Sequence, residues 1–321
     1  MYSWDEDTSK WYGKGRYAYA PAGAVVRADA AERAKASGPR TYEGAGGPNE
    51  KIIDPKKHIT TASTNPLVIA VDVTGSMANW PFEIFDRLPL LYNTLSQYRP
   101  DLEVCFAAIG DGAVDRWPLQ VTNFAGGFDL EQLLGSIYGE GGGGDAPESY
   151  GLFAHWLNTH VTVPNAAEPP FLIVFGDITM HPKTPTGQIS NYLGDDVRGE
   201  VDSVKAWQKV TKTWNTWFLR RPTGKKGDHV DVQWGKAIGE QKIFHIEDEQ
   251  RAVDYAMGLI ARSWGHFSNF QDNMRARQSE ETVQEISEPI ALLCPRCGAP
   301  IPVEASAGLI KCTYCGTTLK V

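Results

Sequence analysis

The sequence predicts an α/β domain built on a doubly wound, mostly parallel six-stranded sheet. Residues 67–71 (Leu-Val-Ile-Ala-Val) and 171–175 (Phe-Leu-Ile-Val-Phe) are continuously apolar, as expected for strands buried on both faces. The first run is followed by apolar residues at helical spacing through residues 82–95. Strand and helix patterns then alternate along the chain, so the connections are crossovers and the strands are expected to be parallel.

The other elements of this domain, residues 65–277, follow in order. Strands are expected at residues 102–109, 119–124, 214–219 and 242–246, and helices at residues 130–138, 148–161, 201–211 and 249–264, with a helical turn near Trp234. The strand at 119–124 is expected at an edge. Open sheets of this kind bind ligands beyond the carboxyl ends of their strands, so polar residues at those ends are the functional candidates.

The flanking segments differ in composition from the α/β domain. Residues 1–64 lack periodicity but are rich in Gly, Ala, Tyr and Trp. They predict an extended arm that lies on a protein surface, because disordered segments are usually poor in aromatic residues. Residues 278–289 are acidic and polar, which is typical of a linker. Residues 290–321 hold four of the five cysteines and form a predicted second unit.

Charge and hydropathy narrow the function classes. The chain of 321 residues has a net charge of -8, which gives no overall attraction to nucleic acid or to an anionic membrane. The longest apolar runs have the length of strands, and the first residues are acidic where a secretory signal would be basic. We therefore expect a cytoplasmic protein without a membrane span, whose cysteines bind metal in a reducing compartment.

Polar side chains follow two of the buried strands. Asp72, Thr74 and Ser76 come directly after the strand at 67–71, and Asp177 follows the strand at 171–175. Carboxylate and hydroxyl oxygens without His or Cys favour a hard cation, and Mg²⁺, Mn²⁺ and Ca²⁺ all fit. The Asp-x-Thr-x-Ser pattern by itself is also common in turns and helix caps. Its place after a buried strand favours a metal site.

The segment 68–77 (Val-Ile-Ala-Val-Asp-Val-Thr-Gly-Ser-Met) resembles the first loop of von Willebrand factor A domains. The resemblance extends over about residues 65–265. It implies a metal-ion-dependent adhesion site in which Asp72 acts largely through water, while the two hydroxyls and Asp177 complete the ligand set. The second loop departs from the family pattern, because Asp145 stands where many members have a threonine. Some members share its Gly-Gly-Gly-Asp-x-Pro-Glu sequence.

Asp145 is thus a further candidate ligand, with helix capping as its alternative role. A more negative ligand set should bind the bare cation more tightly and attract an acidic partner less strongly. Several other polar residues fall in the same group of loops, and we expect them to be ordinary loop residues or solvated surface: Glu148, His181, Asp195, Asp196, Arg220, Arg221, Lys225 and Lys226. Residues 141–144 are all glycine, but no Lys-Ser/Thr follows them, so a phosphate loop is not indicated.

The C-terminal unit carries two Cys-x-x-Cys-Gly sequences, formed by Cys294, Cys297, Cys312 and Cys315. Four thiolates at this spacing predict a closed tetrahedral zinc site of the zinc-ribbon type, with a structural role. Without zinc, a unit of this size would not hold a fold. Cys105 lies within the strand at 102–109 and is expected to be a buried apolar residue.

Two functions remain open at this point. In the favoured one, the protein is a non-catalytic adaptor whose cation organises a face for protein partners in a larger assembly, with the ribbon as a second docking module. In the other, it is a metal-dependent hydrolase or nucleic-acid-processing subunit. Residues 10–17 interleave cations and aromatics as single-strand binders do. The acidic balance and the lack of a recognisable nucleophile or paired histidines favour the adaptor.

Overall fold

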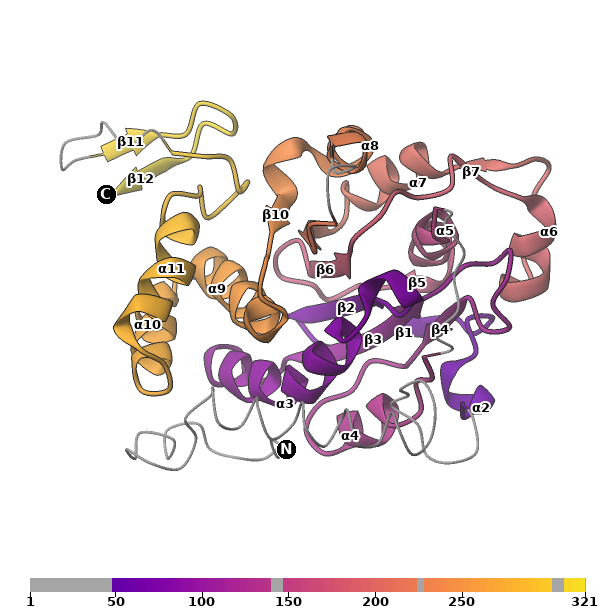
Figure 1. The fold of residues 1–321 in the computed structure, drawn as a ribbon, viewed down its shortest axis with the longest axis horizontal. Helices are drawn as coiled ribbons and strands as arrows, with labels where there is room; N and C mark the ends of the chain where they lie inside the picture. Colours follow the sequence, from indigo (N-terminus) through magenta and orange to yellow (C-terminus); the bar gives the residue numbers. More distant parts are fainter. Residues whose placement is uncertain (1–47, 140–146, 224–227, 302–308, 321) are drawn as a thin grey trace.

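The computed structural model describes residues 48–139, 147–223, 228–301 and 309–320 (Figure 1). Its centre is a six-stranded sheet with the strand order β10-β9-β6-β2-β3-β4. The strands are β2 (Pro66–Asp72), β3 (Glu103–Ile109), β4 (Leu119–Val121), β6 (Phe171–Gly176), β9 (Asn215–Arg220) and β10 (Ile243–His245). All neighbouring pairs are parallel except β3 with β4, which are antiparallel. The predicted mostly parallel sheet, with 119–124 as its edge, is confirmed.

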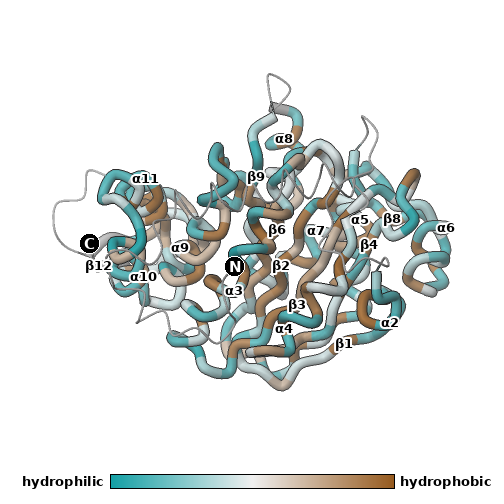
Figure 2. Tube along the Cα trace, turned by 60° about the horizontal axis from the view of Figure 1, so that its bottom comes forward, coloured by the Kyte–Doolittle hydropathy of each residue, from teal (hydrophilic) through white to brown (hydrophobic). Residues whose placement is uncertain are grey.

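Helices cover both faces of the sheet, as a doubly wound fold requires. On one side lie α3 (Trp80–Tyr98) and α9 (Ala252–Trp264), and on the other α5 (Tyr150–His160), α7 (Ser203–Val210) and α8 (Asp228–Ile238) (Figure 1). Successive residues of β2 alternate between the two cores: Leu67, Ile69 and Val71 join the first, and Val68 and Ala70 the second. Because both faces are covered, every residue of β2 is buried, and the central strands are brown in Figure 2. This explains the apolar run without alternation.

The acidic segment 278–289, which we expected to be a linker, is instead part of a helix. Helix α11 (Glu280–Ala291) follows α10 (Phe267–Arg275), and both pack on α9. Val283, Ile286 and Ile290 are buried in the core on this side, at a spacing of three and four residues that is helical. The glutamates lie between these positions and face outward, so the composition of the segment concealed its amphipathic pattern.

Smaller elements complete the described chain. In the N-terminal segment, residues 1–47 lie outside the described part, while α2 (Glu50–Ile53) and β1 (Ile59–Thr60) follow, and β1 pairs with β5 (Val161–Thr162). The other elements are α4 (Asp129–Leu134), β7 (Lys183–Thr184), α6 (Thr186–Gln188), the π-helical turn Ile189–Leu193, β8 (Val201–Asp202), β11 (Leu309–Lys311), β12 (Thr318–Lys320) and the 3-10 turns Gly75–Met77, Glu240–Lys242 and Glu249–Arg251. Strands β11 and β12 pair antiparallel. Among the described helices, none is long and apolar enough to cross a membrane.

Candidate metal centres

The side chains that follow β2 and β6 meet at the carboxyl ends of these neighbouring strands. Asp72 is fully buried, and its Oδ1 accepts hydrogen bonds from the Thr74 backbone N at 2.9 Å and the Thr74 hydroxyl at 2.6 Å. The Ser76 hydroxyl donates to Oδ1 of Asp177 at 3.0 Å and lies 3.3 Å from the Thr74 hydroxyl. The structure thus brings together the four residues that the sequence singled out at these two strand ends.

A fifth residue, Tyr150, belongs to this arrangement and was not predicted. Its hydroxyl, at the start of α5, donates to the other carboxylate oxygen of Asp72. The approach depends on Gly176, because a Cβ there would lie 2.1 Å from the Tyr150 hydroxyl oxygen. Both oxygens of Asp72 are therefore engaged by hydrogen bonds.

Two buried carboxylate oxygens of the site have no hydrogen-bond partner among the described residues. Asp177 Oδ2 and Glu148 Oε2 are buried without a hydrogen-bond partner in the described part of the chain. Burial raises the pKa of Asp72 to about 7, and the nearby charge of Asp177 adds to the rise. Burial also raises the pKa of Asp177, although the Ser76 hydrogen bond and the charges of Arg221 and Arg220 oppose the rise. Unpaired buried carboxylates are costly unless they are protonated or bind a cation.

Glu148, expected to be an ordinary loop residue, is buried beside Asp72 with 2% of its surface exposed. Burial raises the pKa of Glu148 to about 9, and the charges of Asp72 and Asp111 add to this, while the Thr74 hydroxyl opposes it. In the sequence Glu148 stands at the start of the helix predicted at 148–161, which gives no sign of its burial. Asp145, its neighbour in the same loop, lies outside the described residues, as do residues 141–144.

Asp111, which follows β3, was missed although it obeys the same rule as Asp72. It is 1% exposed, and its Oδ1 lies 3.0 Å from Nε2 of His181. His181, expected to be an ordinary loop residue, is therefore tied to this carboxylate. The pair lies on the β3 side of the strand ends, where Asp111 adds to the negative field at Glu148.

The remaining flanking residues have separate roles. Asp195 is bonded to Nε2 of both His155 and His160, at 2.8 and 3.0 Å, and Asp196 is exposed. Arg220, expected on the solvated surface, is instead 2% exposed and pairs with Asp231 at 2.8 Å. Arg221 donates to the Ser76 carbonyl oxygen and so supports the loop after β2. Lys225 and Lys226 lie outside the described residues.

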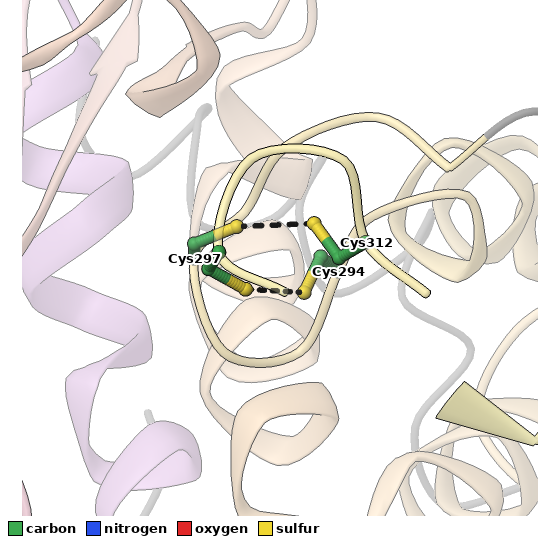
Figure 3. Close-up of side chains that lie close together, drawn as sticks. Cys294, Cys297 and Cys312 are labelled. Carbon is green, nitrogen blue, oxygen red and sulfur yellow. Dashed lines mark hydrogen bonds between the residues drawn. The ribbon is translucent and has the colours of Figure 1, made fainter. Parts of the chain in front are cut away.

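The four cysteines of the C-terminal unit converge on one point (Figure 3). Cys294 Sγ lies 3.8 Å from Cys315 Sγ, and Cys297 Sγ lies 3.6 Å from Cys312 Sγ. Sulfurs bound tetrahedrally at a zinc–sulfur distance of about 2.3 Å would be about 3.8 Å apart, so the arrangement fits a zinc ion. In the described part of the chain, this is the only group of three or more His, Cys, Asp or Glu residues whose ligand atoms all lie within 4.8 Å of one another.

The first cysteine pair is packed against the sheet. Gly298, with a φ of +76°, follows Cys297, and a Cβ there would lie 2.4 Å from the ring of Trp217 in β9. Lys242 places its amine 4.2 Å from the centre of the same ring and 2.7 Å from Oδ1 of Asn215. A cavity of about 610 Å³ opens between this knuckle and the first residues of β6 and β9. The C-terminal unit therefore packs against the α/β domain through Gly298 and Trp217.

Comparison with known proteins adds little to this geometry. No family model matches the sequence, and no curated protein matches it. Among solved structures, proximal thread matrix protein 1 from the mussel byssus is similar at 10% identity and a TM-score of 0.44, covering 65% of this chain and 49% of that chain. A second structure of the same protein, with zinc in its metal-ion-dependent adhesion site (MIDAS) motif, is similar at 9% identity and a TM-score of 0.41. This match covers 62% of this chain and 46% of that chain.

The pilus adhesin SpaC from Lactobacillus rhamnosus GG is also similar, at 10% identity and a TM-score of 0.42, covering 69% of this chain and 31% of that chain. The chain thus spans half or less of the length of these structures. Likeness at these scores does not bear on function, which has to be inferred from the two sites themselves.

Proposed function

We propose that the protein is a non-catalytic, metal-dependent adaptor of the von Willebrand factor A type. A divalent cation, Mg²⁺ or else Mn²⁺ or Ca²⁺, would be held by the hydroxyls of Thr74 and Ser76 and by Asp177, with Asp72 acting through water. The cation would organise a face for a protein partner in a larger assembly in the cytoplasm. Zinc in the four-cysteine site would hold the ribbon as a second docking module.

One observation carries this proposal. Two hydroxyls and two buried carboxyl groups lie together at the carboxyl ends of β2 and β6, and Asp177 Oδ2 has no partner among the described residues. Oxygen ligands of this kind suit hard cations. The Ser76 hydroxyl is bonded to Asp177 and lies near the Thr74 hydroxyl, which supports the assignment of all three side chains to one cation site.

The test measures cation binding and partner binding together. Titration calorimetry with Mg²⁺, Mn²⁺ and Ca²⁺ would compare the full chain with Asp72→Ala and with the exposed control Asp129→Asn. Asp72→Ala should abolish cation binding and the Mg²⁺-dependent capture of a protein partner, while Asp129→Asn changes neither. The same partners captured by wild type and Asp72→Ala would refute the cation as organiser of the docking face. A hydrolytic turnover that Asp72→Ala abolishes would support the hydrolase alternative instead.

A further inference from the structure

Two cations of the α/β domain lie at the contact between that domain and the four-cysteine cluster. Lys242 ends the 3-10 turn Glu240–Lys242, directly before β10, and Arg262 lies in the last turn of α9. Neither residue belongs to the C-terminal unit that carries the cysteines. Their charges therefore act on the cluster from the other side of the contact.

Lys242 is held beside the first cysteine pair by two residues of β9. Its amine donates a hydrogen bond to Oδ1 of Asn215 at 2.7 Å and lies 4.2 Å from the centre of the Trp217 ring. A Cβ at Gly298, the residue after Cys297, would lie 3.2 Å from the same amine and 2.4 Å from the same ring. The amine is therefore in close contact with the backbone of the first cysteine knuckle.

Arg262 binds the chain that leads into the same cysteine pair. Its Nη2 donates to the carbonyl oxygen of Ala291 at 3.0 Å, and its Nε donates to the carbonyl oxygen of Leu293 at 3.4 Å. Leu293 directly precedes Cys294 in the chain. The guanidinium also lies 5.5 Å from the centre of the Phe267 ring. These contacts place a second positive charge of the α/β domain next to the cluster.

The charges that compensate these two cations are those of the cysteines. Burial lowers the pKa of Lys242 to about 8, and the charges that oppose this effect are those of Cys297 and Cys294. Burial also lowers the pKa of Arg262, and the charge of Cys294 opposes it. No described Asp or Glu forms an ion pair with either cation. A partly buried cation is costly unless an anion lies beside it, so both residues depend on the cluster.

We propose that Lys242 and Arg262 are the counter-cations of zinc bound by the four cysteines, so that zinc binding also fastens the C-terminal unit to the α/β domain. This inference rests on the proposed zinc site. Zinc binds thiolates rather than thiols, so one zinc ion with four cysteines carries about two net negative charges. The two cations of the α/β domain match that charge. Because coupling between two equilibria is reciprocal, the seated unit binds zinc more tightly and bound zinc stabilises the α/β domain.

Two measurements on the full chain separate zinc affinity from the stability of the α/β domain. Competition with a chromogenic zinc chelator would measure the affinity. All ten tryptophans precede residue 290, so a thermal melt followed by tryptophan fluorescence does not report on the C-terminal unit itself. The melt would be recorded with and without zinc, at a constant concentration of Mg²⁺. A rise in melting temperature on addition of zinc then measures the coupling.

Lys242→Met keeps the length of the side chain and removes its charge. It should weaken zinc binding about tenfold and reduce the rise in melting temperature that zinc produces in wild type. Lys242→Arg retains the charge and should recover most of both effects, while Arg262→Met should behave as Lys242→Met does. Lys236→Met, at an exposed lysine of α8, should match wild type. If Lys242→Met does not fold, Lys242→Gln takes its place with the same expected losses.

The outcomes distinguish the role of the two cations from the zinc site itself. Zinc affinity and a zinc-dependent rise in melting temperature that are unchanged in Lys242→Met and Arg262→Met overturn the role of the cations and leave the zinc site intact. Equal losses in Lys242→Arg and Lys242→Met also overturn it, because side-chain shape rather than charge would then matter. A wild-type chain that binds zinc no better than Cys312→Ser overturns the zinc site. Loss in Lys242→Met with recovery in Lys242→Arg supports the coupling.

Discussion

Replacing Gly176 with alanine should disrupt the contact that positions Asp72. A Cβ at residue 176 would lie 2.1 Å from the Tyr150 hydroxyl oxygen, 3.0 Å from its Cζ and 3.0 Å from Cε2 of Phe218. Ordinary contacts begin near 3.4 Å, so the hydroxyl would have to move by more than an ångström. A displacement of that size would break its hydrogen bond with Asp72, because the tyrosine is fully buried and cannot turn elsewhere.

The loss of stability in Gly176→Ala has two parts, the overpacking of the core and the broken hydrogen bond. Overpacking a well-packed core typically costs about 1–3 kcal/mol, and a hydrogen bond to a charged group contributes about 1.5–3 kcal/mol. We expect Gly176→Ala to lower the free energy of unfolding by about 3 kcal/mol and Tyr150→Phe, which removes the hydroxyl alone, by about 2 kcal/mol. The double variant should lose about 1–2 kcal/mol less than the sum, because the hydroxyl can be lost only once.

Urea unfolding of the zinc-loaded chain, in buffer free of Mg²⁺, would give the free energy of unfolding of wild type, of the two single variants and of the double variant. Near-UV circular dichroism would report on the tyrosine and on the tryptophan ring packed against it. The Tyr150 ring lies 5.0 Å from that of Trp234, so its displacement should be visible. A Gly176→Ala variant within 0.5 kcal/mol of wild type, or strict additivity with Tyr150→Phe, would refute this account of Gly176.

Three further predictions concern other parts of the chain. Cys312→Ser should lose zinc and unseat the ribbon, which is measured as bound metal and as a red shift of Trp217 fluorescence; full zinc retention would contradict the four-cysteine site. Ile290→Ala should cost about 2–5 kcal/mol in urea unfolding, since Ile290 is fully buried, and a negligible cost would restore the linker interpretation of 278–289. Burial acts to raise the pKa of Asp195, but the hydrogen bonds from His155 and His160 outweigh it and hold the pKa below its usual range. This carboxylate therefore stabilises the fold above about pH 4 and loses that effect as the pH falls further, so the stability difference between wild type and Asp195→Asn should vanish in acid; a constant difference from pH 7 to pH 3 would contradict it.

The sequence predicted those parts of the site that depend on one strand and the residues after it. Asp72 and Asp177 each follow an apolar run, and parallel strands bring their carboxyl ends together. Asp111 follows β3 in the same way and could have been included by the same rule. Glu148 and Tyr150 could not, because their burial depends on a loop that pairs with the ends of two other strands. Such pairings leave no periodic signal in the chain.

The C-terminal segment contains one feature that the sequence predicts well and one that it conceals. The spacing of the four cysteines is enough to predict their cluster, since ligand type and separation determine a closed site. The segment before them was misinterpreted because its glutamates dominate the composition, although its buried positions 283, 286 and 290 follow a helical period. Composition reports what faces solvent, and periodicity reports what faces the core, so the second is the better guide where they disagree.

The two proposed metal sites lie at opposite ends of the sheet, and this separation has a functional consequence. The site of Asp72 and Asp177 begins where β6 ends, at Gly176. The cavity beside Cys297 is lined by Phe171, the first residue of the same strand. The length of this strand puts roughly 17 Å between them. Residues this far apart without shared partners usually contribute independently. Asp72→Ala should therefore leave zinc binding by the four cysteines unchanged, and Cys312→Ser should leave cation binding at Asp72 and Asp177 unchanged.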